Sequence, residues 1–145
     1  MLRFESLGLV EAEKAIAGGI EAARALDKAM AFAVADHAGE MIATARMDGA
    51  NPRILRHSIR KAYTSALMCR HTLSFKRDLE ERGGALDQWG DKNLTTLPGG
   101  LAVQWKGEFV GGVGAGGGGP DDESVARAML RAMGLAVVED SRAER

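Results

Sequence analysis

Apolar residues follow two different rhythms along this chain, and these rhythms predict alternating helices and hairpins. Between residues 9 and 26 they recur every three or four positions, which predicts an amphipathic helix. The apolar runs at 30–36 and 40–47 flank a turn at residues 37–39, which predicts a β-hairpin. A second helix is predicted over about 53–71. Its expected core face comprises Leu55, Ile59, Ala62, Ala66 and Cys69.

The second half of the chain repeats this pattern after a polar interruption. Residues 76–98 contain glycines and a proline and show no sustained period, so we expect a long loop with one helical turn at 77–82. Strands at 101–105 and 108–113 predict a second hairpin. A glycine-rich run follows, and a last helix is predicted over about 122–138.

These elements together predict an α+β fold. The order helix, strand, strand, helix, strand, strand, helix favours an antiparallel sheet flanked by helices. The 145 residues match the length of one domain, spanning 1–145, and no internal repeat is visible. Residues 139–145 are expected to fray as a terminal tail.

Composition excludes several classes of partner. The net charge of −1 and the pI near 6.3 provide no basic surface for nucleic acid or an anionic membrane. No apolar run approaches the roughly 20 residues of a membrane span, and the N-terminus does not look like a signal peptide. The single cysteine, Cys69, excludes an internal disulfide and fits a reducing compartment. We therefore expect a cytoplasmic protein without nucleic-acid or membrane partners.

The glycine-rich run within residues 106–122 is the most distinctive segment of the chain. Glycine backbone at a helix N-terminus can approach and bind an anion. The Lys-Ser/Thr of a P-loop is absent, because Pro120, Asp121 and Asp122 stand in its place and would repel a polyphosphate. A flexible turn beside a pocket is the simpler interpretation. The candidate ligand-binding residues of this run are Gly114, Gly116 and Gly117.

A second candidate site combines charged residues from the first hairpin and the second helix. Arg46 and Asp48 lie on the same side of a strand end, and Lys61 is expected near the same end of the sheet. A guanidinium, an ammonium and backbone N–H groups can hold a small carboxylate or propionate, and Asp48 could orient a cation or act as a base. Alternatively, Arg46 and Asp48 form a structural pair that fixes the hairpin to the second helix.

Histidines on the predicted second helix offer candidate iron ligands. A stripe opposite its apolar face contains His57, Lys61, Thr64, Met68 and His71. The two histidines are about 21 Å apart along a helix, so they cannot bind one metal together, but either one could serve alone as an axial haem ligand. The alternative is a solvated helix face. No dedicated metal site is expected, because the histidines and Cys69 lack metal-site spacing.

Several motifs resemble the GlcG/HbpS family, which is also found as the C-terminal domain of PduO-type proteins. The resemblance covers residues 9–136. It rests on Val34-Ala35-Asp36-His37-Ala38-Gly39, Arg46-Met47-Asp48-Gly49-Ala50, Lys61-Ala62-Tyr63-Thr64-Ser65-Ala66, Thr72, Leu97-Pro98-Gly99-Gly100-Leu101, the glycine run and Asp122. The resemblance implies a profilin-like fold, a homo-oligomer, and binding of haem or a corrinoid. The position of Trp89 in a glycine-interrupted loop and the methionine-rich helices also favour an oligomer.

The resemblance leaves three functions open. The first is a small-molecule-binding protein whose possible cofactor is haem or another tetrapyrrole. The second is an enzyme of small-molecule catabolism that holds an organic acid with Arg46 and Lys61, the candidate catalytic residues being Asp48, Lys61 and His57. The third is an oligomeric accessory protein without chemistry. Haem-binding relatives are thought to use a histidine in the first helix, and residues 9–26 contain none.

Overall fold

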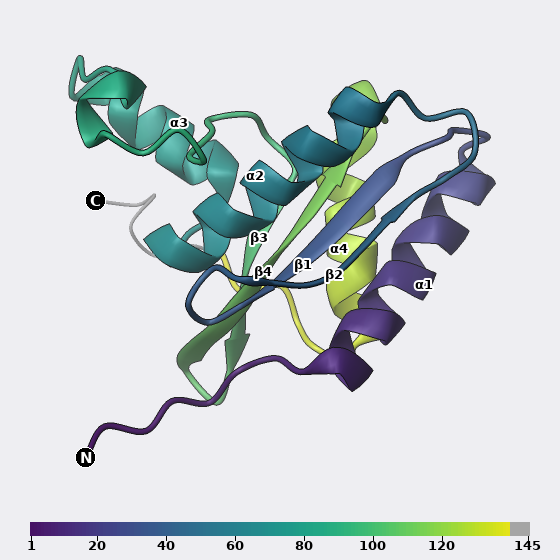
Figure 1. Cartoon of the computed structure of the whole chain (residues 1–145), viewed down its shortest axis with the longest axis horizontal. Helices are drawn as coiled ribbons and strands as arrows, with labels where there is room; N and C mark the ends of the chain where they lie inside the picture. Colours follow the sequence, from purple (N-terminus) through teal and green to yellow (C-terminus); the bar gives the residue numbers. More distant parts are fainter. Residues whose placement is uncertain (140–145) are drawn as a thin grey trace.

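A four-stranded antiparallel sheet lies between two groups of helices in the computed structural model, which describes residues 1–139 (Figure 1). The spatial order of the strands is β2-β1-β4-β3, so the two hairpins join through β1 and β4. The strands are β1 (Ala31–Asp36), β2 (Met41–Arg46), β3 (Gly100–Trp105) and β4 (Glu108–Gly116).

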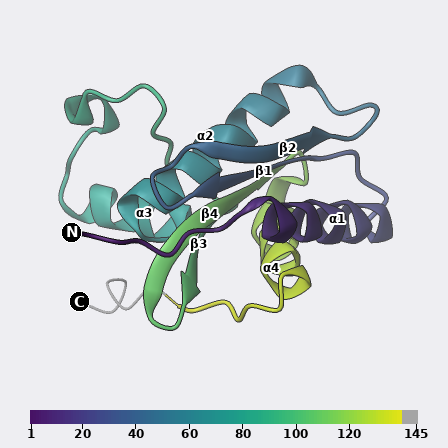
Figure 2. The same ribbon diagram turned by 60° about the horizontal axis from the view of Figure 1, so that its bottom comes forward.

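Helices cover both faces of this sheet (Figure 2). One face is covered by α1 (Leu9–Ala25) and α4 (Asp122–Ala132), and the other by α2 (Pro52–Met68). The helix α3 (Thr72–Glu81) follows α2 and contacts β3. Two short 3₁₀ turns complete the chain, η1 (Leu86–Trp89) and η2 (Gly119–Asp121).

Large apolar side chains fill the space between the sheet and the pair α1/α4. Phe32 and Val34 alternate along β1 with alanines, so that the large residues face this side and the small ones face α2. Met129 and Leu130 of α4 are fully buried against them. This is the main apolar core of the protein.

The face toward α2 is built from small residues instead. Gly112, Gly114 and Gly116 alternate along β4 and lie directly under α2. A Cβ added at Gly114 would lie 2.1 Å from the carbonyl oxygen of Ser58, so only glycine permits this approach. The helix therefore packs backbone to backbone on the sheet, and its buried face can carry short polar residues.

The structure confirms the α+β class and both hairpins but corrects three boundaries. The second helix ends at Met68, because Cys69 adopts the left-handed conformation with φ 53° and its N–H bonds to the carbonyl of Ser65. Part of the expected loop is the helix α3 rather than a single turn. The last helix ends at Ala132, close to Gly134 with φ 77°. The tail predicted to fray lies outside the described residues except for Glu139.

Candidate functional site

An open hollow of about 720 Å³ lies at the end of the sheet where β4 leads into α4. Five segments meet there: the first half of α2, the start of α3, the loop before β3, the glycine turn after β4, and the start of α4. The lining residues are Arg53, Ile54, His57, Lys61, Leu73, Leu97, Pro98, Gly116, Gly117, Gly119, Pro120, Asp122 and Glu123. We call it the Lys61 hollow.

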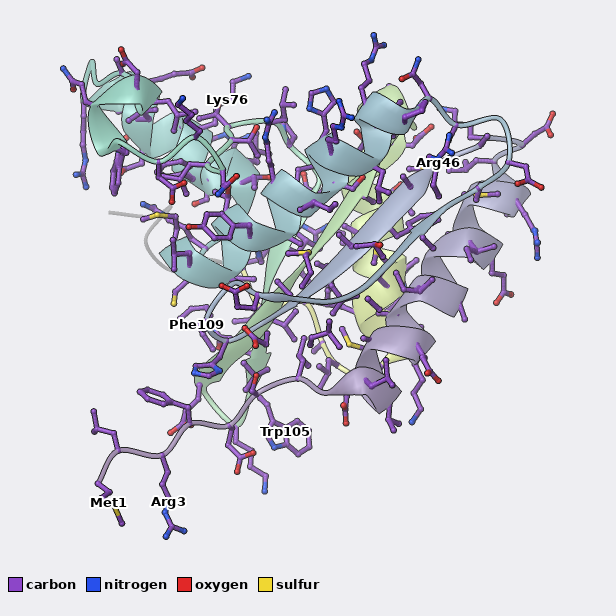
Figure 3. The ribbon with its side chains drawn as sticks, viewed as in Figure 1. Met1, Arg3, Arg46, Lys76, Trp105 and Phe109 are labelled. Carbon is purple, nitrogen blue, oxygen red and sulfur yellow. The ribbon has the colours of Figure 1, made fainter. Side chains whose placement is uncertain are left out.

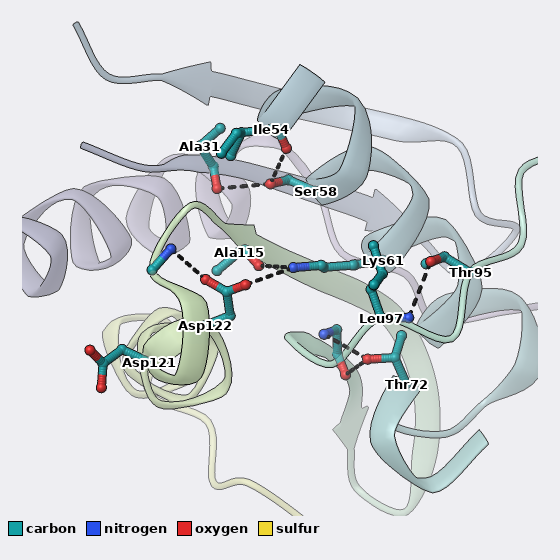
Figure 4. Close-up of polar contacts among 12 residues, drawn as sticks. Ala31, Ile54, Ser58, Lys61, Thr72, Thr95, Leu97, Ala115, Asp121 and Asp122 are labelled. Carbon is teal, nitrogen blue, oxygen red and sulfur yellow. Dashed lines mark hydrogen bonds and ion pairs between the residues drawn. The ribbon is translucent and has the colours of Figure 1, made fainter. Parts of the chain in front are cut away.

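Lys61 crosses from α2 to the opposite wall of this hollow (Figure 4). Its side chain is only 4% exposed, and its Nζ donates to Asp122 Oδ2 at 2.9 Å and to the carbonyl oxygen of Ala115 at 2.8 Å. Gly99 leaves room for this path, since a Cβ at that position would lie 3.1 Å from Nζ. The buried ammonium is therefore held by a full negative charge and a backbone acceptor.

Asp122 extends this connection into the glycine turn. Its second oxygen, Oδ1, accepts a hydrogen bond of 2.7 Å from the N–H of Gly118 (Figure 4). Next to it, Lys28 donates to Asp121 Oδ2 at 2.6 Å and to the carbonyl of Gly118 at 2.8 Å. The acids that exclude a P-loop thus fix the turn to α2 and to the segment before β1.

His57 lies one turn before Lys61 on α2 and lines the same hollow. Burial lowers the pKa of its imidazole below the ordinary value, and the positive charges of Lys61, Arg60 and Arg53 lower it further. The ring is therefore mainly neutral at pH 7. Within residues 1–139 neither ring nitrogen has a hydrogen-bonding partner, so a nitrogen lone pair remains for a ligand.

The other histidines differ from His57 in this respect. His71 does not continue a stripe of α2 but precedes α3, and it is buried. Its Nδ1 accepts from the N–H of Ala102 at 3.1 Å, and its Nε2 lies 2.8 Å from the carbonyl oxygen of Val138. A neutral ring protonated on Nε2 makes both bonds, so both nitrogens are engaged. His37 lies in the β1–β2 turn and stacks on Phe4 at 5.0 Å.

The solvated helix face, which was the alternative interpretation of the stripe, does not describe Lys61 and Thr64. Lys61 and Thr64 are buried, and Thr64 accepts a hydrogen bond from the N–H of Thr95 through its hydroxyl. The predicted core face is right for Ala62 and Ala66, while Leu55 and Ile59 are only partly buried. The cause is the row of glycines in β4. It lets α2 bury a face of small and polar residues, whereas the sequence pattern predicted that a face with larger apolar residues would be buried.

Arg46 and Asp48 do not line the Lys61 hollow, so the structure does not bring the expected charged cluster together. Figure 3 shows Arg46 where β2 leads toward α2. It is exposed and donates to the carbonyl oxygen of Ala50 at 2.8 Å, which closes the turn before α2. No ion pair joins Arg46 to Asp48 in the described chain, so the structural pair that was the alternative is also not formed.

The three candidate glycines have different surroundings. Gly114 is buried beneath α2, where it serves the packing of the helix and leaves no space for a ligand. Gly116 and Gly117 line the hollow. Sequence reasoning missed Arg53, Leu73, Leu97 and the pairing of Asp122. Arg53 could have been found from the sequence, because it lies in the first turn of a helix whose charged residues are all positive.

The fold and the hollow define a small α+β protein with a ligand-sized cleft. A family model of haem-degrading HbpS-like proteins matches residues 7–131, so the chain belongs to that family. A search of curated protein sequences found no match. Residues 1–139 contain no helix with the length and apolar character that a membrane crossing requires.

Solved structures show the same fold. A crystal structure of a double mutant of HbpS from Streptomyces reticuli is 30% identical, with 89% of this chain and 88% of that chain covered and a TM-score of 0.81. A PduOC:haem complex is 23% identical over 92% of this chain and 99% of that chain, with a TM-score of 0.82. ORFY from Klebsiella pneumoniae is 23% identical over 92% and 94%, with a TM-score of 0.84.

Proposed function

We propose that this protein binds haem or a related tetrapyrrole in the Lys61 hollow and that His57 is the iron ligand. The observation that carries this proposal is the state of His57, a neutral imidazole without a hydrogen-bonding partner in the described chain, at the wall of a large hollow. Neutral imidazole is the form that binds iron, and one histidine suffices for haem. Haem bound in the Lys61 hollow would supply an iron atom that His57 could coordinate.

The remaining walls suit a flat amphipathic ligand. Ile54, Leu73 and Leu97 provide apolar contacts, and the glycine turn at 116–119 offers close backbone approach. A volume of about 720 Å³ falls within the range of ordinary ligand clefts. Membership of the HbpS-like family and a solved relative named as a haem complex also support this ligand class.

The position of His57 differs from the ligand expected in haem-binding relatives. The first helix, α1, contains no histidine and covers the opposite face of the sheet. The proposed iron site therefore belongs to α2 of this chain. The catabolic alternative lacks support, because Arg46 and Lys61 do not line one hollow. A homo-oligomer stays a prediction, and the exposed side chains of Leu67 and Trp89 favour it.

Haem titration monitored by absorbance tests the proposal. The wild type should give a saturable Soret shift at one haem per chain, and His57→Ala should remove the histidine signature from the spectrum. His37→Ala is the matched control, because His37 lies outside the hollow, and it should match the wild type. A spectrum equal to free haem would overturn the proposed function. Unchanged binding by His57→Ala would overturn the axial role alone.

A further inference from the structure

We infer that Arg53 makes the Lys61 hollow selective for ligands that carry a carboxylate. This inference rests on the proposed function, because it assigns a charge to the ligand of the same hollow. Arg53 lies in the first turn of α2 and lines the hollow. It is exposed and forms no ion pair within residues 1–139. A guanidinium in this state can bind a carboxylate through two parallel hydrogen bonds.

The other charges of the hollow are already paired. Asp122 receives the ammonium of Lys61 at 2.9 Å. Glu123 receives the guanidinium of Arg127, one turn along α4, at 3.0 Å. These pairs neutralise both acids and the buried cation. The charge left to meet a ligand is therefore the positive charge of Arg53.

The position of Arg53 in its helix adds to this positive potential. The N-terminal end of a helix carries a partial positive charge, which favours acids in the first turn and disfavours cations. The first turn of α2 contains no acid, and the charged residues of the whole helix, Arg53, Arg56, Arg60 and Lys61, are all cations. Such an arrangement costs stability in the free protein, and an anion beside Arg53 would offset that cost.

The neighbouring imidazole responds to the same field. Burial lowers the pKa of His57 most, and the positive charges of Lys61, Arg60 and Arg53 lower it further. A carboxylate bound at Arg53 would oppose those charges and stabilise the same region. The hollow thus combines an apolar wall at Ile54 and Leu97, a neutral nitrogen donor and one free cation at its rim. This set fits a planar apolar body with a carboxylate at its edge.

A solvated surface arginine is the alternative, and a pair of probes separates the two. The test uses equilibrium dialysis of 2-naphthoate and of its neutral amide, 2-naphthamide, against the wild type, Arg53→Gln and Arg56→Gln. Arg56 is the matched control, since it lies on the same helix, is exposed and does not line the hollow. The probes share one ring system and differ in charge, so the comparison isolates the carboxylate.

We expect the wild type to bind 2-naphthoate more tightly than the amide. Arg53→Gln should weaken 2-naphthoate binding about tenfold, the size of a lost charge-assisted hydrogen bond at an exposed site, and leave amide binding unchanged. Arg56→Gln should leave both affinities unchanged. The loss should also shrink at high salt, because an exposed charge is screened.

Three results would overturn the inference. They are equal wild-type affinity for the two probes, equal losses in Arg53→Gln and Arg56→Gln, and no binding of either probe. Equal losses would mean that the whole positive face of α2 attracts anions without a specific contact. Haem titration stays independent of this test, since absence of a Soret shift would overturn the proposed function and leave the naphthoate selectivity standing.

Discussion

The two faces of the sheet are stabilised in different ways. Toward α1 and α4 the sheet presents large apolar side chains, such as Phe32, that are fully buried against Met129 and its neighbours. Toward α2 it presents alanine and glycine, and α2 buries the polar residues Ser58, Lys61 and Thr64 on this side. The first face gains stability from apolar area removed from water. The second gains it from close backbone contact and satisfied polar groups.

This difference explains why the hollow forms on the α2 side. A layer without large side chains lets α2 lie close to β4, so the lysine of α2 reaches the carbonyl of Ala115 at the end of that strand. Buried polar groups need partners, and the partners come from the ends of neighbouring segments. Polar atoms therefore gather at the edge of this layer, where a ligand has access.

The largest effect is expected from breaking the buried ion pair of the α2 face. Lys61→Met leaves the carboxylate of Asp122 without its cation and the carbonyl of Ala115 without its donor. We expect a loss of about 3 kcal/mol in the free energy of unfolding, measured by urea denaturation. The cost comes from the uncompensated charge, since the methylene chain keeps its packing.

A double variant checks that interpretation. Asp122→Asn removes the orphaned charge and keeps an amide oxygen that can accept from the N–H of Gly118. Lys61→Met combined with Asp122→Asn should therefore be more stable than Lys61→Met alone. If the single variant unfolds at the same urea concentration as the wild type, the α2 face does not depend on this pair and the comparison of the two faces fails.

A smaller effect is expected from the glycine strand. Gly114→Ala places a methyl group against the backbone of Ser58 and Ala62, which side-chain rotation cannot relieve. We expect a loss of about 1–3 kcal/mol by the same denaturation assay, as for overpacking of a core. Gly84→Ala is the control, because its new methyl group would come close only to the flexible end of the Leu79 side chain and would lie at an ordinary van der Waals distance of 3.8 Å from the carbonyl oxygen of Leu79. Equal stability of the two variants would contradict the close approach of α2.

The sequence predicted those elements whose signal is local. The helix at 9–26 and both hairpins were predicted closely, because apolar periodicity and turn residues mark them. The end of α2 was wrong, since Cys69 adopts a left-handed conformation without the glycine that usually signals it. Only one helical turn of α3, at 77–82, was predicted, because few residues of this helix are buried and apolar, Phe75 being the clearest.

The candidate site was predicted only in part for a related reason. His57, Lys61, Gly116 and Gly117 do line one hollow, but the pairing of Lys61 with Asp122 joins residues 61 positions apart in the chain. The periodicity of apolar residues cannot indicate a contact between residues so far apart in the chain. Arg46 looked equivalent to Lys61 as an isolated cation, yet only the fold determines which cation reaches the hollow. The predicted end of the last helix at residue 138 was wrong, although Gly134, a residue type that commonly ends helices, stood in the sequence as a signal.

The smallest effect is expected from His57 and concerns pH. Its pKa in the folded protein lies below the ordinary value of 6.5, because burial and nearby cations disfavour the protonated ring. Well above pH 6.5 the ring is neutral in both the folded and the unfolded chain, so it contributes no pH dependence there. As the pH falls below that value, the unfolded chain takes up the proton first and unfolding is favoured.

Urea denaturation at pH 7.5 and pH 5.5 therefore distinguishes the wild type from His57→Gln. The wild type should lose more stability on acidification than His57→Gln, by less than the effect of Gly114→Ala, since His57 lies at the wall of an open hollow. An equal loss in both proteins would mean that neither burial nor the nearby cations lower the pKa of this ring. The same direction of the pKa implies that His57 keeps a free lone pair at a pH where an ordinary imidazole is protonated. Haem coordination by the wild type should accordingly persist below pH 6.5.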